Sequence, residues 1–367
     1  MQLAIYHSCG HGLTAPRMSL ARCTNISVAT AAGSWSKAAD GGYRYHARDC
    51  LLVRPSASRV HKCLRHRHLL FIGDSLQRYL YLTLANLLVT GEWPRDLNAG
   101  ERSPCFEGAY ALNKTHDEIW PEYFRGTNGD LRGAEICDCF RTGCCSEAVL
   151  NENRYTLHDG AAVSFVSQMV SPGWHVHGSI LPDSWPRMRA RTTCTPGECA
   201  ATSTGRDRPG RTGTSANMPD KRWAWSEPLP NFLRTTMPHL GVTDLLFNPG
   251  HHYNPDANLP FMRRVFDSAT RGASHRAWWR TTTPRLRGGL SATSRQGFPL
   301  GVKGATSLAR EMGVGVVDVL TMLMQLPRQL KSADWATTEG AFVDGVHLQC
   351  SVNRELLIVM LNAMCAF

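Results

Sequence analysis

A serine, an aspartate and a histidine, the first far from the other two along the chain, have the types and spacing of a nucleophilic triad. Ser75 follows the apolar run His68–Ile72 in the stretch "HLLFIGDSLQR". A serine hydroxyl becomes a nucleophile only when a base takes its proton, and a carboxylate must hold that base in one tautomer. Asp344 and His347 lie three residues apart in "FVDGVHLQ", so one helical turn can place them side by side. These residues predict acyl transfer, with Ser75 as nucleophile, His347 as general base and Asp344 as its orienting partner.

Each member of this triad also has a simpler structural interpretation. A serine between a strand and a helix commonly caps the helix, and the aspartate of "DGVH" would cap the last helix of the chain in the same way. A phosphate-binding loop is poorly supported, because the stretch around Ser75 contains neither G-x-G-x-x-G nor G-K-[ST]. The GDS sequence alone favours a cap, whereas GDS together with "DGVH" favours a nucleophile.

Four further residues stand where they could support the site. Gly73 permits a tight turn out of the strand, and Asp74 directly precedes the serine. Free N–H groups at a helix N-terminus favour negative charge, so the N–H of Ser75 is expected to stabilise an oxyanion. In "NPGHHYNP", which follows another expected strand, Asn248 and the N–H of Gly250 are predicted as additional donors.

Two arginines are candidates for anchoring this site. Arg78 lies three residues after Ser75, so it shares a face of the expected helix. Arg280, in "WWRTTTP", follows an expected strand and could pair with a carboxylate near the serine. A purely structural role is equally compatible with the positions of both arginines.

No metal site is predicted at either cluster of ligand-type residues. The adjacent His251 and His252 would point to opposite sides of an extended chain, which disfavours joint ligation. The segment "CDCFRTGCC", from Cys137 to Cys145, has a spacing that fits no common zinc pattern. We expect a disulfide-tied loop there instead.

The cysteine content predicts an oxidising environment. The chain has 13 cysteines, and N-x-S/T sequons occur at Asn25 and Asn113. Together these favour a glycoprotein of the secretory pathway with several disulfides. No signal peptide or apolar run of membrane-spanning length is visible, so no membrane span is predicted.

Strands alternate with helices over most of the chain, which predicts an α/β fold with a parallel sheet covered on both faces. In such sheets, functional residues gather at the carboxyl ends of the strands. The expected strands are His68–Ile72, Ala161–Val170, Val242–Phe247, His275–Thr281 and Val314–Val319. The expected helices are Leu76–Leu88, Pro230–His239, Pro260–Thr270, Thr306–Met312 and Ser351–Met364.

The remaining segments suggest one domain with irregular additions. Residues 1–44 are predicted to be an irregular leader, and residues 45–367 one catalytic domain. Residues 49–64 and 92–160 are expected to be irregular or loop-rich, and residues 187–222, rich in Gly, Thr, Arg and Pro, to be a flexible insertion.

Composition describes a globular protein with a basic surface. Apolar residues make up 43% of the chain and charged residues 19%, and the net charge is +10. The basic residues are scattered rather than interleaved with aromatics in a stripe, so no nucleic-acid partner is predicted.

Four short sequence blocks, taken in their order along the chain, resemble those of the PC-esterase branch of the SGNH/GDSL hydrolase superfamily. This branch includes the plant trichome-birefringence-like polysaccharide O-acetyltransferases. "LLFIGDSLQR" is similar to the family's GDS block, "LLFNPGHHYN" and "WWRTTTP" to its middle blocks, and "FVDGVHLQ" to its D-x-x-H block. The blocks are spread over residues 45–367 and fill a minor part of that span. Many plant members have a tryptophan where this chain has His252.

The resemblance implies a three-layer α/β/α, flavodoxin-like fold and a Ser75–His347–Asp344 triad. It also implies an acetyl donor such as acetyl-CoA as co-substrate, with no bound cofactor, and a glycan or polysaccharide acceptor in the Golgi lumen or outside the cell. A carbohydrate acetyl esterase would use the same triad with water as acceptor. Two more functions stay open on the sequence alone, namely a lipase-like esterase and a catalytically inactive glycan-binding protein.

Overall fold

The structure is a computed structural model. It describes residues 20–96, 103–106, 116–142, 149–167, 175–178, 225–248, 250, 254–271, 275–284, 303–326, 340–343 and 346–367. The predicted insertion at 187–222 lies outside these residues, as do residues 1–19 of the predicted leader.

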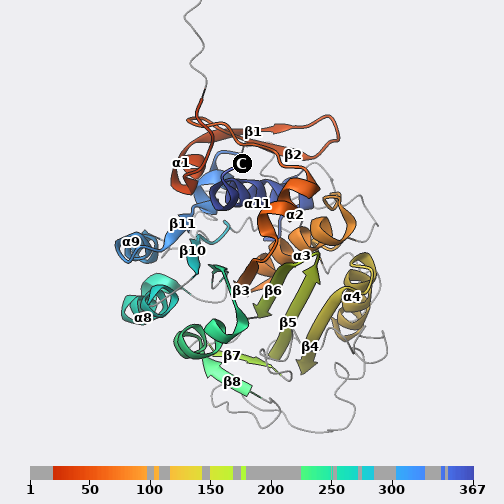
Figure 1. The fold of residues 1–367 in the computed structure, drawn as a ribbon, viewed down its shortest axis with the longest axis vertical. Coiled ribbons are helices and arrows are strands. Elements are labelled where there is room, and N and C mark those ends of the chain that lie inside the picture. Colours follow the sequence, from red (N-terminus) through yellow and green to blue (C-terminus); the bar gives the residue numbers. More distant parts are fainter. Residues whose placement is uncertain are drawn as a thin grey trace, which may run out of the picture.

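A seven-stranded mixed sheet forms the centre of the fold (Figure 1). In spatial order its strands are β11 (Gly315–Val317), β10 (Arg276–Arg280), β9 (Asp244–Phe247), β3 (His68–Gly73), β6 (Ala161–Ser167), β5 (Val149–His158) and β4 (Glu135–Thr142). The first five strands are parallel to one another, and their order along the sheet is 2-1-3-4-5 when they are numbered along the chain. The α/β class predicted from the alternation is therefore confirmed.

The wholly parallel sheet that we predicted is wrong, because β5 and β4 extend it with antiparallel pairing. Both strands lie in the segment expected to be loop-rich, and α4 (His116–Asp130) precedes them. A two-residue turn joins β5 to β6, with positive φ at Asp159 (46°) and Gly160 (81°). An Asp-Gly pair between strands is typical of such hairpins, so the sequence did contain this signal.

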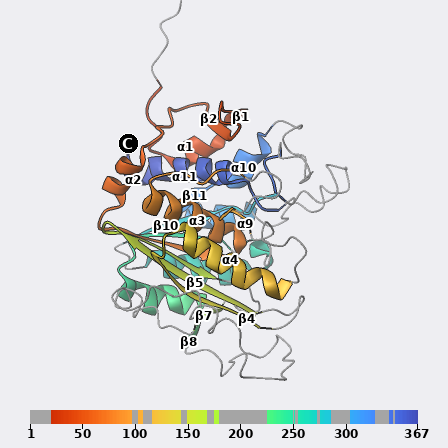
Figure 2. The ribbon, with the colours of Figure 1, turned by 90° about the vertical axis from the view of Figure 1, so that its right-hand side faces the viewer.

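Helices cover both faces of the sheet (Figures 1 and 2). Besides α4, one face carries α1 (Ile26–Ala31), α2 (Ala57–Leu64), α3 (Ser75–Thr90), α10 (Val319–Met324) and α11 (Cys350–Cys365). The other carries α7 (Leu229–Asn231), the π turn η3 (Phe232–Thr236), the 3-10 turn η4 (Met237–Leu240), α8 (Leu259–Thr270) and α9 (Lys303–Glu311). β3 alternates between the two cores, since Leu69 and Phe71 face the first and Leu70 and Ile72 the second.

Two smaller pairs of strands lie outside the central sheet. β1 (Gly33–Lys37) and β2 (Tyr43–Ala47) form a hairpin beside α11, and β7 (His175–Gly178) pairs with β8 (Trp225–Pro228). The N–H of Tyr45 donates to the buried carboxylate of Glu355 on α11 at 3.0 Å. Residues 26–47 thus differ from the irregular leader predicted for 1–44. Alternating inward aromatics, including Trp35 and Tyr45, explain the strands.

The boundaries of the predicted elements change in two further places. Residues 57–64, expected to be irregular, form α2, which begins with a Ser56 side-chain cap. The single helix expected at Pro230–His239 is instead α7 followed by η3 and η4. Pro238 lacks an N–H and disfavours regular helix at this point.

Three disulfides join described cysteines, as the cysteine content predicted. They are Cys23–Cys50, Cys63–Cys365 and Cys105–Cys350, and Cys137 is disulfide-bonded as well. Two of them hold the ends of α11, one at Cys350 and the other at Cys365. Disulfides are typical of proteins that fold in an oxidising compartment.

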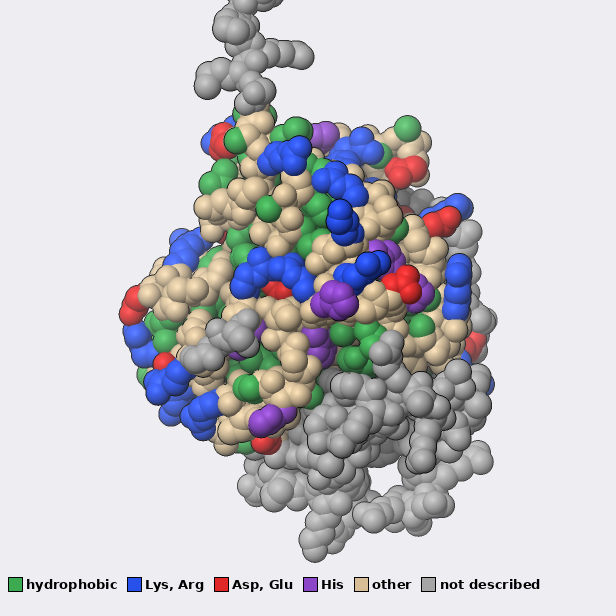
Figure 3. Space-filling model, in the orientation of Figure 1, with side chains coloured by type: hydrophobic (Ala, Val, Ile, Leu, Met, Phe, Trp, Pro, Cys, Tyr) green, Lys and Arg blue, Asp and Glu red, His purple; other side chains and the backbone are tan. Residues whose placement is uncertain are grey.

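Two observations concern the predicted partners: the distribution of basic side chains on the surface, and the length and apolarity of the helices. Lys and Arg side chains form several separate groups over the described part of the face in Figure 3. None of the helices that the structure describes is long and apolar enough to cross a membrane.

A buried histidine at the start of β3 should make stability depend on pH. The Nδ1–H of His68 donates to the Leu240 carbonyl at 3.0 Å, and Nε2 lies 2.7 Å from the Ser164 hydroxyl. Burial lowers the pKa of His68 to about 4. In the unfolded chain the same histidine has an ordinary pKa of about 6.5. Between about pH 6.5 and pH 4 the unfolded state therefore binds a proton that the folded state does not. We expect His68 to remove about 3 kcal/mol from the free energy of unfolding as the pH falls from 7 to 4.

The measurement is urea unfolding of the wild type and of His68→Gln at pH 7, 5.5 and 4. The glutamine can donate and accept hydrogen bonds but does not titrate, so the difference between the two proteins should shrink as the pH falls. A constant difference across this range would contradict the prediction.

Candidate functional site

Ser75 begins α3 directly after the carboxyl end of β3. The carboxylate of Asp74 caps this helix and accepts from the N–H of Leu76 at 3.0 Å. Ser75 is half-buried, and within the described part of the chain its backbone N–H donates no hydrogen bond. The first N–H groups of a helix lack intrahelical acceptors, so this donor faces the site with the positive end of the helix dipole.

Gly73 lets the chain turn tightly between β3 and α3. A Cβ on Gly73 would overlap the carbonyl oxygen of Asn248 and would stand 2.6 Å from Cγ of Gln77. Only glycine allows the loop after β9 and the first turn of α3 to approach this closely.

His347 reaches Ser75 from the other end of the chain. Its Nε2 lies 2.7 Å from the Ser75 hydroxyl, within hydrogen-bond distance. His347 lies three residues before α11, in a loop where the N–H of Val343 donates to the His347 carbonyl at 2.8 Å. The structure thus brings together two of the three residues predicted to form a triad. Asp344, the third, lies outside the described residues.

This pair lies where strand order favours a ligand site. In open α/β sheets, ligands bind beyond the carboxyl ends of the strands, where the order reverses. In the order 2-1-3-4-5 that point lies between β3 and β9. Ser75 follows β3, and the loop at Asn248 follows β9.

Asn248 and Gly250, predicted as oxyanion donors, are bonded to each other and to the segment at the end of β10. The amide oxygen of Asn248 accepts from the N–H of Gly250 at 2.6 Å. Its amide nitrogen donates to the Arg280 carbonyl at 2.6 Å and to the Thr282 hydroxyl at 3.2 Å. These bonds tie the loop after β9 to the end of β10, and the roles of both residues in supporting the site or as oxyanion donors stay predictions.

Gly250 is a position where any side chain should disrupt the site. Its φ is +65°, and a Cβ there would overlap the carboxylate of Asp74. We expect Gly250→Ala to displace the Asp74 cap, lower the free energy of unfolding by about 2 kcal/mol and reduce any activity that needs Ser75. Thermal unfolding and turnover are the measurements.

Gly129, near the end of α4, provides the matched control. Its φ is not positive, and a Cβ there would meet nothing within 4 Å. Gly129→Ala should leave stability unchanged or raise it by up to about 1 kcal/mol. Equal effects of the two substitutions would contradict the steric argument at Gly250.

Arg280 carries a buried positive charge beside the site. Its side chain is fully buried, and no hydrogen-bond partner of the guanidinium lies among the described residues. Burial lowers the pKa of Arg280 to about 10, and the negative charge of Asp74 opposes this shift. Arg280 therefore remains charged at neutral pH and is electrostatically coupled to the residue that caps α3.

Arg78 is buried on α3 and packs against aromatic rings. Its guanidinium carbon is 4.7 Å from the ring centroid of Tyr79 and 5.4 Å from that of Tyr123. It also donates to the Tyr79 hydroxyl at 3.0 Å. Arg78 thus makes cation–π contacts within the layer of α3 and α4, and its role in anchoring the site stays a prediction.

Two aromatic residues at the site were missed by the sequence analysis. The ring of Tyr79 meets the imidazole of His347 edge-on, with centroids 5.2 Å apart, and the ring of Phe106 lies 5.5 Å away. Tyr79 follows Ser75 by four residues, and this helical spacing could have revealed it. Nothing near Phe106 in the sequence indicates its place; the residue before it, Cys105, is bonded to the distant Cys350.

No metal site is found among the residues that the structure describes. His251 and His252 lie outside the described residues. Within the described ranges, no group of three or more His, Cys, Asp or Glu side chains is arranged to hold a metal ion.

Neither a scan against protein-family models nor a search of curated proteins found a match to this chain.

Proposed function

We propose that this protein is a carbohydrate O-acetyltransferase that acts through an acyl-enzyme on Ser75. The observation that carries the proposal is the 2.7 Å contact between the Ser75 hydroxyl and Nε2 of His347. These two residues are 272 positions apart and meet at the carboxyl ends of the strands. A serine at a helix N-terminus with an imidazole on its hydroxyl is the arrangement that nucleophilic catalysis needs.

The strand order supports assignment to the SGNH superfamily that the sequence blocks resemble. The parallel strands follow the 2-1-3-4-5 order of flavodoxin-like folds, with helices on both faces. Ser75 of the GDS block and Asn248 of the "LLFNPG" block follow the carboxyl ends of β3 and β9, and His347 of the D-x-x-H block contacts Ser75. The disulfides are consistent with work in the secretory pathway or outside the cell, where glycans are acetylated.

In the first step, Nε2 of His347 takes the hydroxyl proton while Oγ of Ser75 attacks the carbonyl carbon of an acetyl donor. The tetrahedral oxyanion is stabilised by the Ser75 N–H and the dipole of α3. The imidazolium then returns its proton to the leaving group, and the acetyl group remains on Oγ. Asp344 would hold the imidazole in the required tautomer.

In the second step, His347 takes the proton of a sugar hydroxyl, whose oxygen attacks the acyl-enzyme. The carbon–Oγ bond breaks, the imidazolium protonates Ser75, and the acetylated sugar leaves. Water in place of the sugar hydroxyl would complete the same cycle as an esterase. What reaches the acyl-enzyme decides between the two activities.

Mass spectrometry of oligosaccharides distinguishes these outcomes. Wild type and Ser75→Ala are incubated with acetyl-CoA and either unmodified or acetylated plant-type oligosaccharides. New acetylated sugars with the wild type alone support the transferase, and loss of existing acetyl groups with the wild type alone means an esterase. Turnover that survives in Ser75→Ala rejects the acyl-enzyme mechanism.

A further inference from the structure

His347 lies in a loop, so side chains from other segments that pack against its imidazole help to fix the ring, besides the orienting role proposed for Asp344. The bond from Val343 to the His347 carbonyl and the bridge between Phe342 and Leu348 hold its backbone. The orientation of the ring depends on what packs against it. For proton transfer, this orientation matters as much as the presence of the base.

Two aromatic rings from separate segments contact this imidazole. Tyr79 meets it at 81° from α3, the helix that also carries Ser75, and is fully buried. Phe106 meets it at 42° and is half-buried. Tyr79 is fixed by its helix, whereas Phe106 belongs to neither a helix nor a strand. Its place against His347 therefore depends on how residues 103–106 are attached.

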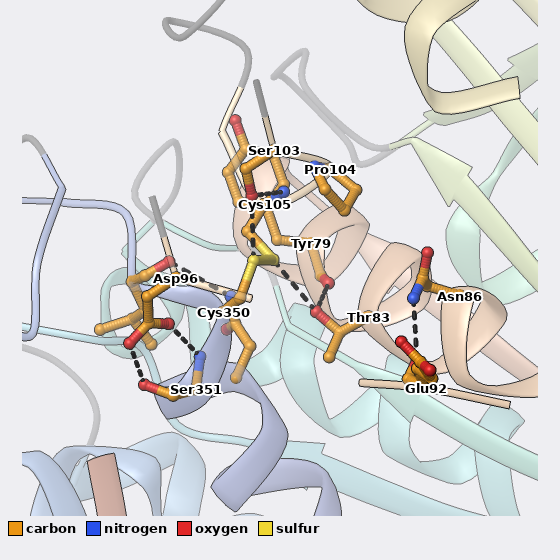
Figure 4. Close-up of a disulfide and its surroundings, with 12 residues drawn as sticks. Tyr79, Thr83, Asn86, Glu92, Asp96, Ser103, Pro104, Cys105, Cys350 and Ser351 are labelled. Atoms are coloured by element: carbon orange, nitrogen blue, oxygen red, sulfur yellow. Dashed lines mark hydrogen bonds between the residues drawn. A yellow bond between two sulfur atoms is a disulfide. The ribbon is translucent and has the colours of Figure 1, made fainter. Parts of the chain in front are cut away.

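The Cys105–Cys350 disulfide makes that attachment (Figure 4). Cys105 precedes Phe106, and Cys350 follows His347 by three residues at the start of α11. The Ser103 hydroxyl accepts from the N–H of Cys105 at 3.1 Å and lies 3.0 Å from Sγ of Cys350. The disulfide thus joins the segment that carries His347 to the segment that carries Phe106, whose ring packs on the imidazole.

Surrounding contacts fix both sides of this link. On one side the Thr83 hydroxyl of α3 lies 3.5 Å from Sγ of Cys105, and the Tyr123 hydroxyl donates to the Pro104 carbonyl at 3.3 Å. On the other side the carboxylate of Asp96 accepts from the N–H of Ser351 at 2.6 Å and so satisfies one of the free N–H groups in the first turn of α11. The disulfide is therefore a bridge between two positioned segments.

We propose that Cys105, Cys350 and Phe106 form a clamp, here called the His347 clamp, that holds the imidazole against Ser75. Phe106 is then a positioning residue, and turnover depends on this disulfide more than on the others. The inference rests on the proposed acyl-transfer function. It adds a determinant of activity that lies outside the triad.

The Cys63–Cys365 disulfide is a matched control within the same helix. It joins α2 to the last residue of α11, about 22 Å from Cys350 at the helical rise per residue. Its loss should lower stability, as loss of any native disulfide does, without releasing Phe106.

The test compares Phe106→Leu, Phe106→Tyr, Cys105→Ser/Cys350→Ser and Cys63→Ser/Cys365→Ser with the full-length wild type. We expect Phe106→Leu to lower kcat on the order of tenfold with little change in KM, and Phe106→Tyr, which keeps the ring, to restore it. Cys105→Ser/Cys350→Ser should lower kcat at least as much as Phe106→Leu. Cys63→Ser/Cys365→Ser should keep kcat while its Tm falls. The pH dependence of kcat/KM should change only where the clamp is broken.

Wild-type kcat in Phe106→Leu would overturn the proposal, as would equal losses of kcat in the two folded double variants. If Cys105→Ser/Cys350→Ser does not fold, Phe106→Leu decides the result, because it keeps the disulfide. If the wild type shows no turnover, the proposed function fails, and NMR of the His347 ring then tests the clamp separately. The clamp predicts that the linewidth and titration midpoint change in Phe106→Leu but not in Cys63→Ser/Cys365→Ser, and an unchanged His347 signal in Phe106→Leu overturns it.

Discussion

Replacing Ser75 with alanine should lower acetyl turnover by at least about 10⁴-fold, because no other atom can take the acyl group in the proposed mechanism. The half-buried hydroxyl contacts His347, and its removal leaves the Asp74 cap of α3 intact. The fold should therefore survive, with thermal unfolding close to that of the wild type. Steady-state kinetics with an activated acetyl ester, together with circular dichroism, measures both effects.

The control for this prediction is a second variant at the same site. His347→Ala alone should lose nearly as much activity as Ser75→Ala, and the double variant should lose little more, since the two residues act as one unit. If the fold-loss of activity in the double variant equals the product of the two single losses, Ser75 and His347 act independently. The proposed mechanism would then be wrong.

Breaking the buried ion pair between β4 and β5 should have the largest effect on stability. Arg154 donates to both carboxylate oxygens of Glu135, at 3.0 and 2.9 Å, and both side chains are fully buried. Burial raises the pKa of Tyr81 well above its usual value, so the Tyr81 hydroxyl stays protonated and donates to Glu135 at 3.0 Å. Arg154→Met would leave a buried carboxylate without its counter-charge, and we expect a loss of about 3–5 kcal/mol in the free energy of unfolding.

Urea unfolding measures this loss against an exposed pair of the same type. Arg263 and Glu311 are 3.1 Å apart but more than half exposed, so Arg263→Met should change stability by less than about 1 kcal/mol. Arg154→Met combined with Glu135→Leu removes both charges and should recover part of the loss. Similar effects of Arg154→Met and Arg263→Met would contradict the prediction.

The elements that carry Ser75 could be predicted because their signals are local. An apolar run of strand length, a glycine and a helical pattern define β3 and α3, and the structure begins the helix at Ser75 itself. The strands β9, β10 and β11 were found for the same reason. Their shared carboxyl edge then follows from the parallel pairing.

The antiparallel edge of the sheet was missed because composition outweighed a short signal. The segment from 92 to 160 is rich in glycine and cysteine, which indicated loops. The Asp159–Gly160 turn between β5 and β6 was the local evidence against that interpretation. A hairpin of this kind extends a parallel sheet without needing a crossover helix.

The contacts around His347 could not be predicted from local sequence. Phe106 follows Cys105, which is bonded to a cysteine 245 residues away, and disulfide connectivity does not follow from cysteine positions. For Asn248 and Gly250 the sequence indicated the right place at the edge of the sheet. Which atoms they donate to depends on the conformation of the loop after β9.

The central claim is that Ser75 accepts an acyl group, and peptide mass spectrometry tests it most directly. The protein is incubated with an acetyl donor, quenched in acid and digested, and the peptide that contains Ser75 is sequenced. We predict one acetyl group on Ser75 in the wild type, at a level that falls when oligosaccharide is added, and none in Ser75→Ala or His347→Ala. An unmodified Ser75 in a wild-type sample that turns over the donor, or the same labelling in Ser75→Ala, would contradict this account.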